Sequence, residues 1–150
     1  MIEIKKFSAN QRIYFKKAKE IRYKVFVIGQ NCPEELEWEF EEESTHFLLL
    51  VDGIHKAAAR HRKTKNGYKL ERFAVLKSER GKGLGYKILK AILEDLSDFD
   101  GEIYMHAQKD VIPFYEKAGF IKEGKEFEEA NILHYKMKLK RNLETLEVQL

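Results

Sequence analysis

The segment from Leu70 to Asp95 limits the possible folds more than any other part of the chain. It combines a strand-like apolar run, three glycines in five residues (Gly81–Gly85) and an amphipathic helix pattern. Glycines let the backbone adopt positive φ and let a ligand approach the main chain closely. The following amides then converge at a helix N-terminus, where the dipole favours an anion. We therefore expect a phosphate or pyrophosphate ligand here, with Arg80 and Lys82 adding positive charge beside it.

Two well-known phosphate loops do not fit this segment. A Walker loop needs Gly-Lys-Ser or Gly-Lys-Thr, which the chain lacks. A dinucleotide-binding fingerprint needs G-x-G-x-x-G, whereas this loop reads G-x-G-x-G and has no matching acidic strand end about 20 residues on. A plain strand-to-helix turn does not explain three glycines between cations, so we expect a different phosphate-binding loop.

The N-terminal part of the chain predicts a strand and then a helix. Residues 2–5 alternate between apolar and charged side chains, which indicates a short strand. From Asn10 to Ile28 one apolar stripe recurs at helical spacing, formed by Tyr14, Ala18, Ile21, Val25 and Ile28. Ser8 or Asn10 is expected to cap this helix and Gly29 to end it.

The middle of the chain predicts an antiparallel meander. Strands are expected at His46–Val51, Ile54–His61 and Tyr68–Leu76, with Asp52-Gly53 and Asn66-Gly67 as the turns between them.

The C-terminal third predicts a strand, a short helix and a final strand pair. Strands are expected at residues 102–107, 120–128 and 132–139. The short helix between them has Asp110 as its cap, Pro113 in its first turn and Gly119 at a left-handed exit. The sequence thus predicts one α+β domain over residues 1–150, in which only the weakly amphipathic tail, 141–150, is unassigned.

Composition narrows the class of protein. The chain has 150 residues, enough for one core, and its 43% hydrophobic and 35% charged residues are typical of a globular protein. The single Cys32 excludes a disulfide framework and a cysteine-based zinc site. No apolar run approaches the roughly 20 residues of a membrane helix. The N-terminus lacks a signal peptide's apolar segment, so we expect a cytoplasmic protein that binds neither membrane nor, at a net charge of +3, nucleic acid.

At this point the sequence resembles a known family, the GNAT N-acetyltransferases. Their core motif, Q/R-x-x-G-x-G/A, is met by Arg80, Gly83 and Gly85 after the strand Glu71-Arg72-Phe73-Ala74-Val75-Leu76. A second segment, Phe114-Tyr115-Glu116-Lys117-Ala118-Gly119-Phe120, is similar to the family's F-Y-E-K-x-G-F and follows about 30 residues later. A finer resemblance is to the bacterial ElaA-like branch, through Arg22-x-x-Val25-Phe26-Val27, Ala107-Gln108 and His134-x-x-Met137.

The resemblance implies a fold, a reaction and a coenzyme site. The fold is the GNAT acyl-CoA N-acyltransferase fold, a mixed, mostly antiparallel central sheet flanked by helices. The reaction is acetyl transfer from acetyl-CoA to a primary amine by direct attack, without a metal. The strand at Ala74–Leu76 pairs with the pantetheine arm, and the amide of Val75 or Leu76 polarises the thioester carbonyl. The implied coenzyme-binding residues are Ala74, Val75, Leu76, Arg80, Gly81, Lys82, Gly83, Leu84, Gly85, Gln108 and Phe114.

The same resemblance implies candidates for proton transfer. Tyr115 is the candidate general acid, because its ordinary pKa near 10 lets it donate a proton to the departing thiolate; the alternative is that it only packs beside Phe114. For the general base, Glu71, His106, His134 and water all remain open. Cys32 could act as an acyl carrier, but its interpretation as a small buried residue is the stronger one.

Charge is unevenly distributed and bears on the acceptor. Residues 34–43 hold seven glutamates and no base, whereas eleven basic residues lie between Arg60 and Lys90. One interpretation is an acidic wall for a cationic acceptor such as a polyamine, an amino sugar or a lysine side chain, with Trp38 and Phe40 as an apolar face. The other is a solvated acidic stretch in which Trp38 and Phe40 anchor to the core.

Alternatives from other classes remain. The chain could be a GNAT-fold module that senses acyl-CoA without turnover. An acyl-homoserine-lactone-type synthase can share an R-x-x-V-F-like first helix, but such chains run longer. Either a monomer or a homodimer fits the sequence.

Overall fold

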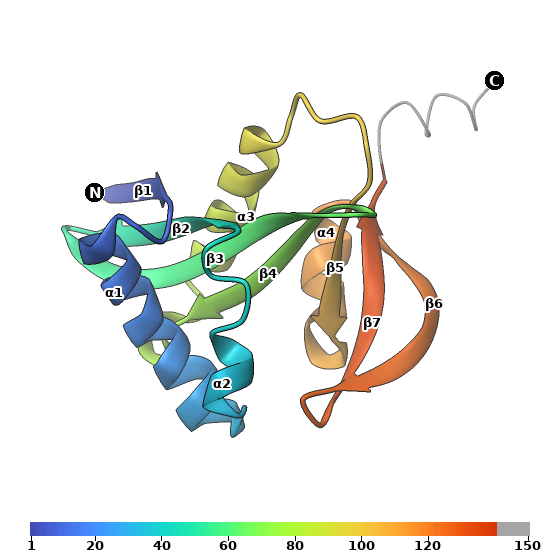
Figure 1. The fold of residues 1–150 in the computed structure, drawn as a ribbon, viewed down its shortest axis with the longest axis horizontal. Coiled ribbons are helices and arrows are strands. Elements are labelled where there is room, and N and C mark those ends of the chain that lie inside the picture. Colours follow the sequence, from blue (N-terminus) through green and yellow to red (C-terminus); the bar gives the residue numbers. More distant parts are fainter. Residues whose placement is uncertain (141–150) are drawn as a thin grey trace. The chain divides into compact units, whose positions relative to one another are not determined.

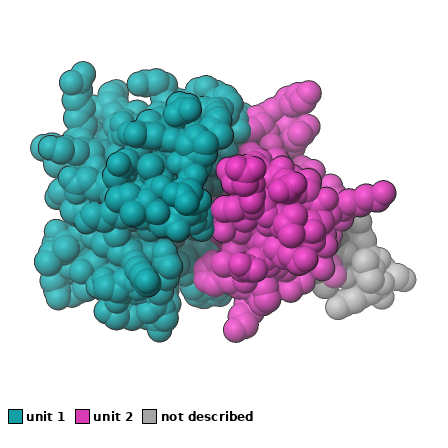
Figure 2. Space-filling view, turned by 90° about the horizontal axis from the view of Figure 1, so that it is seen from below, with its two compact units in different colours: residues 1–63, 71–100 teal, residues 64–70, 101–150 magenta. Residues whose placement is uncertain are grey.

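The computed structural model describes residues 1–140 (Figure 1). These residues form two compact units, coloured separately in Figure 2. The first unit comprises Met1–Lys63 and Glu71–Asp100, and the described part of the second comprises Thr64–Leu70 and residues 101–140. Each unit is described by itself below.

The elements fall into helical and strand groups along the chain, with three strands in succession in the middle and two strands together at the end. In the first unit they are β1 (Ile2–Phe7), α1 (Arg12–Arg22), the π-helical η1 (Tyr23–Ile28), α2 (Glu34–Glu37), β2 (Ser44–Val51), β3 (Ile54–Thr64), the second part of β4 (Gly67–Val75), η2 (Lys77–Glu79) and α3 (Leu84–Asp95). In the second unit they are the start of β4, then β5 (Ile103–Gln108), η3 (Lys109–Val111), α4 (Ile112–Lys117), β6 (Phe120–Glu129) and β7 (Ile132–Leu139).

The strand order is β1-β2-β3-β4-β5-β7-β6. β1 and β2, β2 and β3, β5 and β7, and β6 and β7 pair antiparallel, whereas β4 and β5 pair in parallel at Tyr68, Lys69 and Leu70. The prediction of an α+β fold with a mixed, mostly antiparallel sheet is confirmed.

Both faces of β2 are buried, which explains its continuous apolar sequence. Leu48 and Leu50 point to one face and join a cluster with Ile21 of α1. Phe47 and Leu49 point to the opposite face, because successive strand residues alternate. On that face Phe47 lies 5.6 Å from the His61 ring, and His61 hydrogen-bonds Asp95 of α3 at 2.8 Å. Helices therefore cover β2 from both sides.

The predicted hairpin between β2 and β3 is confirmed. Asp52 and Gly53 both have positive φ, at 52° and 82°, as a two-residue primed turn requires. The Asp52 carboxylate also pairs with the Met1 ammonium group.

The first helix differs from its prediction in three respects. It is α-helical only to Arg22 and continues as the π-helical η1, whose wider turns shift the apolar stripe; Ile28 is consequently 64% exposed rather than buried. Its N-cap is Gln11, without a side-chain cap bond, so the predictions for Ser8 and Asn10 were wrong. Gly29 follows η1 in a right-handed conformation, but helical residues continue through Gln30, up to Asn31, which has φ 54°, so the helix does not end at Gly29.

The second unit confirms most of its predicted features. Pro113 lies at the start of α4, Gly119 has φ 99°, and the strand pair β6–β7 forms as expected. Asp110 is not the cap, because a short 3-10 turn, η3, occupies that position and Val111 precedes the helix. The tail at 141–150 lies outside the described residues. Among residues 1–140, no helix is both long and apolar enough to span a bilayer.

Candidate active site

The glycine-rich loop opens α3 in the geometry of an anion site. Gly81 and Gly83 are left-handed, with φ 82° and 78°, and an added Cβ at either position would meet nothing within 4 Å. Gly83 is the N-cap of α3, and no side chain caps this helix end. The first intrahelical bond runs from Lys87 N–H to Gly83 O, so the N–H groups of Leu84 and Gly85 precede the helical ladder. The arrangement can bind an anion through main-chain donors.

Hydrogen bonding at the end of β4 distinguishes the two amides, Val75 and Leu76, that are candidates for contact with the thioester. The Leu76 N–H donates to Lys56 O of β3 at 3.1 Å. Since successive N–H groups point to opposite sides of a strand, the Val75 N–H points away from β3. Of the two amides that the resemblance implied, Val75 is therefore the one with the suitable orientation. Ala74 is buried at 2% exposure and packs in the α1 cluster.

The two cations of the loop have intramolecular partners. Arg80 Nε donates to Val75 O at 3.1 Å. Lys82 pairs with Glu79 at 3.0 Å, and Glu79 also pairs with Lys56 at 3.2 Å. Hydrogen bonds with Lys82 and Lys56 hold the pKa of Glu79 below its ordinary value. An incoming phosphate would share or replace these contacts.

Tyr115 lies in the second unit, in α4. It is 7% exposed, and its ring makes edge contacts with Phe114 at 5.0 Å and Phe120 at 6.2 Å. Burial raises the pKa of Tyr115, so the hydroxyl retains its proton throughout the neutral range. Gln108 ends β5, opposite His134 of β7.

The candidate bases have defined surroundings. Glu71 is 8% exposed, and its Oε1 accepts hydrogen bonds from Arg60 at 3.0 Å and Arg62 at 2.7 Å. Protonation of Glu71 would therefore disturb charge-assisted bonds. In the second unit, Glu129 lies 3.1 Å from His106 Nδ1 and 3.8 Å from His134 Nε2.

Sequence reasoning missed a buried network in the first unit, which we call the arginine–glutamate chain. Seven side chains alternate in charge through successive ion pairs, in the order Arg72, Glu37, Arg22, Glu41, Arg60, Glu71 and Arg62. Three of its members are almost fully buried, because Arg22 and Arg60 are each 1% exposed and Glu37 is 2% exposed. Burial raises the pKa of Glu37, and Arg22 and Arg72 act in the opposite direction. The polar spacing of these residues carried no helical or strand signal that could have revealed the network.

The arginine–glutamate chain partly neutralises the acidic segment, residues 34–43. Glu37 and Glu41 are paired with arginines, which leaves five exposed glutamates, at positions 34, 35, 39, 42 and 43. Arg60, Arg62 and Arg72 are engaged here, so three of the eleven basic residues between Arg60 and Lys90 belong to the network.

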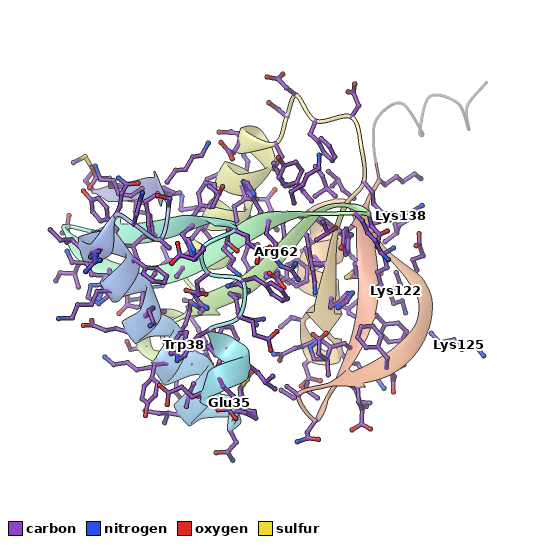
Figure 3. All side chains as sticks on the ribbon, in the orientation of Figure 1. Glu35, Trp38, Arg62, Lys122, Lys125 and Lys138 are labelled. Atoms are coloured by element: carbon purple, nitrogen blue, oxygen red, sulfur yellow. The ribbon has the colours of Figure 1, made fainter. Side chains whose placement is uncertain are left out.

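The two aromatic residues of the segment contact cations of the protein itself. Figure 3 shows Trp38 and Glu35 at α2, with Trp38 on the side of α1, where Lys19 Nζ lies 4.6 Å from its ring centroid. The Arg62 guanidinium stacks 3.9 Å from the Phe40 ring.

Cys32 is half-buried rather than fully buried. Burial, followed by the nearby Glu37 carboxylate, raises the pKa of its thiol. A raised pKa reduces the thiolate fraction, which disfavours Cys32 as an acyl carrier.

Comparison with known proteins agrees with this geometry. Residues 9–141 match the family model described as "Acetyltransferase (GNAT) domain". The uncharacterized N-acetyltransferase YjcF of Bacillus subtilis is 40% identical over 121 residues, covering 78% of this chain and 86% of the relative. Among solved structures, Escherichia coli ElaA has a TM-score of 0.82 at 25% identity, covering 93% of this chain and all of that chain. The PaiA N-acetyltransferase of Thermoplasma acidophilum, solved with coenzyme A, shares the fold. Its TM-score is 0.67 at 15% identity, and the match covers 94% of this chain and 99% of that chain. The chain therefore belongs to the GNAT family and is an acetyl-CoA-dependent N-acetyltransferase similar to ElaA.

Proposed function

We propose that this enzyme transfers the acetyl group of acetyl-CoA directly to a primary amine. One observation carries the proposal: the end of β4 and the start of α3 follow each other along the chain. At the end of β4 the Val75 N–H points away from β3, and the α3 N-terminus has no side-chain cap and begins with two left-handed glycines. Main-chain donors at α3 suit the coenzyme's pyrophosphate, and the Val75 amide suits the thioester oxygen.

The reaction needs two proton transfers. An alkyl amine has a pKa near 10, so it arrives protonated and must lose a proton to a base. Its lone pair then attacks the thioester carbonyl carbon, the C–S bond breaks, and coenzyme A leaves as a thiolate that takes up a proton. We propose Tyr115 as the donor, supported by its motif position and by a buried hydroxyl that stays protonated at neutral pH. For the general base, the candidates are still Glu71, His106, His134 and water.

Tyr115→Phe tests the acid role. We expect kcat for thiol release to fall about 100-fold, a usual range for loss of a general acid, with little change in the dissociation constant of acetyl-CoA. Stopped-flow thiol detection and calorimetry measure the two quantities. Tyr23→Phe, which removes the hydroxyl of a 39% exposed residue of η1, is the control. Unchanged kcat in Tyr115→Phe would remove this residue from the acid role.

For the acceptor, we propose a cationic amine. The five exposed glutamates near α2 support this preference, because they create a negative field. A thiol-release assay against a panel of polyamines, amino sugars, lysine peptides and neutral or anionic amines tests it. Turnover restricted to neutral or anionic amines would contradict the acceptor class. Acetyl-CoA binding with no thiol release across the panel would instead favour a sensor module.

A further inference from the structure

The arginine–glutamate chain connects α2 with one unusual residue of β4. Arg72 has φ 59°, in the left-handed region, although it lies within a strand and carries a full side chain. This conformation is unfavourable for a residue with a Cβ, so it persists only where the surroundings hold it.

The surroundings of Arg72 come from α2. Arg72 Nη2 donates to Leu36 O at 3.0 Å, and its Nε donates to Glu37 O at 3.4 Å. The same Nε lies 3.3 Å from the Glu37 carboxylate. Both acceptors lie at the C-terminal end of α2, where the free carbonyl groups of a helix favour a cation.

Glu37 is in turn held from its other side. Its Oε1 accepts a hydrogen bond from Arg22 Nε at 2.7 Å, and Arg22 Nη2 donates to Glu37 O at 2.7 Å. Since Arg22 is 1% exposed at the end of α1, the carboxylate of Glu37 has little freedom to move. The left-handed conformation of Arg72 is thus fixed by two helices that precede it by 35 and more residues.

A left-handed residue inside a strand redirects the residues after it, because it interrupts the regular alternation of side chains and N–H groups. Those residues are Ala74, which packs into the α1 cluster, and Val75, whose amide is the proposed donor to the thioester. Any change in φ at Arg72 would rotate this amide.

We propose that Arg72 and Glu37 are positioning residues for acetyl transfer. Through these two residues α2 holds the left-handed conformation at position 72 of β4, and this conformation sets the direction of the Val75 amide. This inference rests on the proposed function. The pyrophosphate contacts lie farther along the chain, in the loop before α3, so the two residues affect turnover rather than coenzyme affinity.

Paired variants at position 72 test the inference. Asparagine tolerates the left-handed region, whereas the β-branched valine does not, and both remove the guanidinium group. We expect Arg72→Val to lower kcat about 100-fold, the effect of a misplaced reacting group, while Arg72→Asn retains most of the turnover. The acetyl-CoA dissociation constant, measured by calorimetry, stays unchanged in both. Equal losses of kcat in the two variants, or a parallel loss of coenzyme affinity, would overturn the inference.

A second pair of variants tests the link to α2 and covers the case in which Arg72→Val does not fold. Glu37→Gln keeps the shape but removes the charge that holds Arg72 and Arg22, and we expect kcat to fall about tenfold at unchanged coenzyme affinity. Glu3→Gln, on an exposed residue of β1 in the same unit, is the matched control and should leave kcat unchanged. Equal kcat in the Glu37 and Glu3 variants would contradict the inference. Wild-type protein that neither binds acetyl-CoA nor releases thiol would instead refute the proposed function itself.

Discussion

At the scale of single residues, the loop before α3 depends on the conformation of its glycines rather than on lack of space. Gly81 and Gly83 have open surroundings, yet both adopt φ near +80°. A residue with a Cβ would have to bear the left-handed conformation or change the direction of the N–H groups around it. Main-chain geometry is therefore the property that a substitution here would disturb.

Gly83→Ala should weaken coenzyme binding. We expect a stability loss of about 1–2 kcal/mol and a rise of at least about tenfold in the acetyl-CoA dissociation constant, because the strained loop loses its donor arrangement. Gly53→Ala is the matched control, since Gly53 has φ 82° and equally open space but lies in the β2–β3 turn. Urea unfolding should show similar losses for both variants, and calorimetry should show a binding defect only for Gly83→Ala. Equal affinities would contradict the assignment of this loop to the coenzyme.

Two buried histidines should make stability depend on pH. Burial lowers the pKa of His46 below its ordinary value of 6.5, and it lowers the pKa of His61 likewise. Below about pH 6.5 the unfolded chain binds protons that the folded protein does not, so stability is complete above this pH and falls as the pH decreases. The decrease is at most about 1.4 kcal/mol per pH unit for each histidine.

His46→Gln should reduce this pH dependence. The amide can still donate to Glu41 O, which His46 Nε2 contacts at 3.0 Å, but it does not titrate. Urea unfolding at pH 7.5 and 5.5 should give a smaller difference in the free energy of unfolding for the variant than for the wild type. An identical difference would mean that His46 is not kept neutral by the fold.

At the scale of elements, α2 is too short to be stable by itself, and ion pairs hold it in place. It has four residues, of which three are glutamates. Arg22 at the end of α1 bonds both Glu37 and Glu41, and so connects α1 to the segment on either side of Trp38. Bonds with these two carboxylates raise the pKa of Arg22 despite its burial.

Arg22→Met should therefore be strongly destabilising. The substitution keeps an apolar side chain of comparable length but leaves Glu37 and Glu41 with one fewer buried cation. We expect a loss of about 3–5 kcal/mol in the free energy of unfolding, as when one partner of a buried pair is removed. Arg12→Met, on an exposed residue at the start of the same helix, should change stability little. Losses of similar size in the two variants would show that burial of the pair is not the cause.

At the scale of the whole molecule, the net charge of +3 conceals an uneven distribution, although one less extreme than the sequence suggests. The arginine–glutamate chain places four arginines against three glutamates within the first unit. Outside this network, the acidic segment keeps five exposed glutamates, and the loop and α3 keep the exposed cations Arg80, Lys82, Lys87 and Lys90.

Added salt should therefore lower the catalytic efficiency, kcat/KM, with a cationic acceptor. At saturating acetyl-CoA, we expect kcat/KM for the best cationic amine to fall as ionic strength rises from low salt to about 0.15 M, where the Debye length is about 8 Å. A triple variant, Glu34→Gln, Glu35→Gln and Glu39→Gln, should lose much of this salt dependence. A salt response that the triple variant retains in full would mean that these glutamates do not face the acceptor.

The sequence by itself determined the class of fold, most strands and the family, because these follow from local patterns. Period-two alternation, the Asp52-Gly53 turn and the spacing of Arg80, Gly83 and Gly85 each act within a few residues. Only the tertiary structure decided the partners of the charged side chains. Arg22 meets Glu37 and Arg72 meets Leu36 only after segments 15 and 36 residues apart come together, and no local rule encodes such pairs. The left-handed Arg72 has the same origin, since its conformation opposes its own local preference and exists because α2 stabilises it.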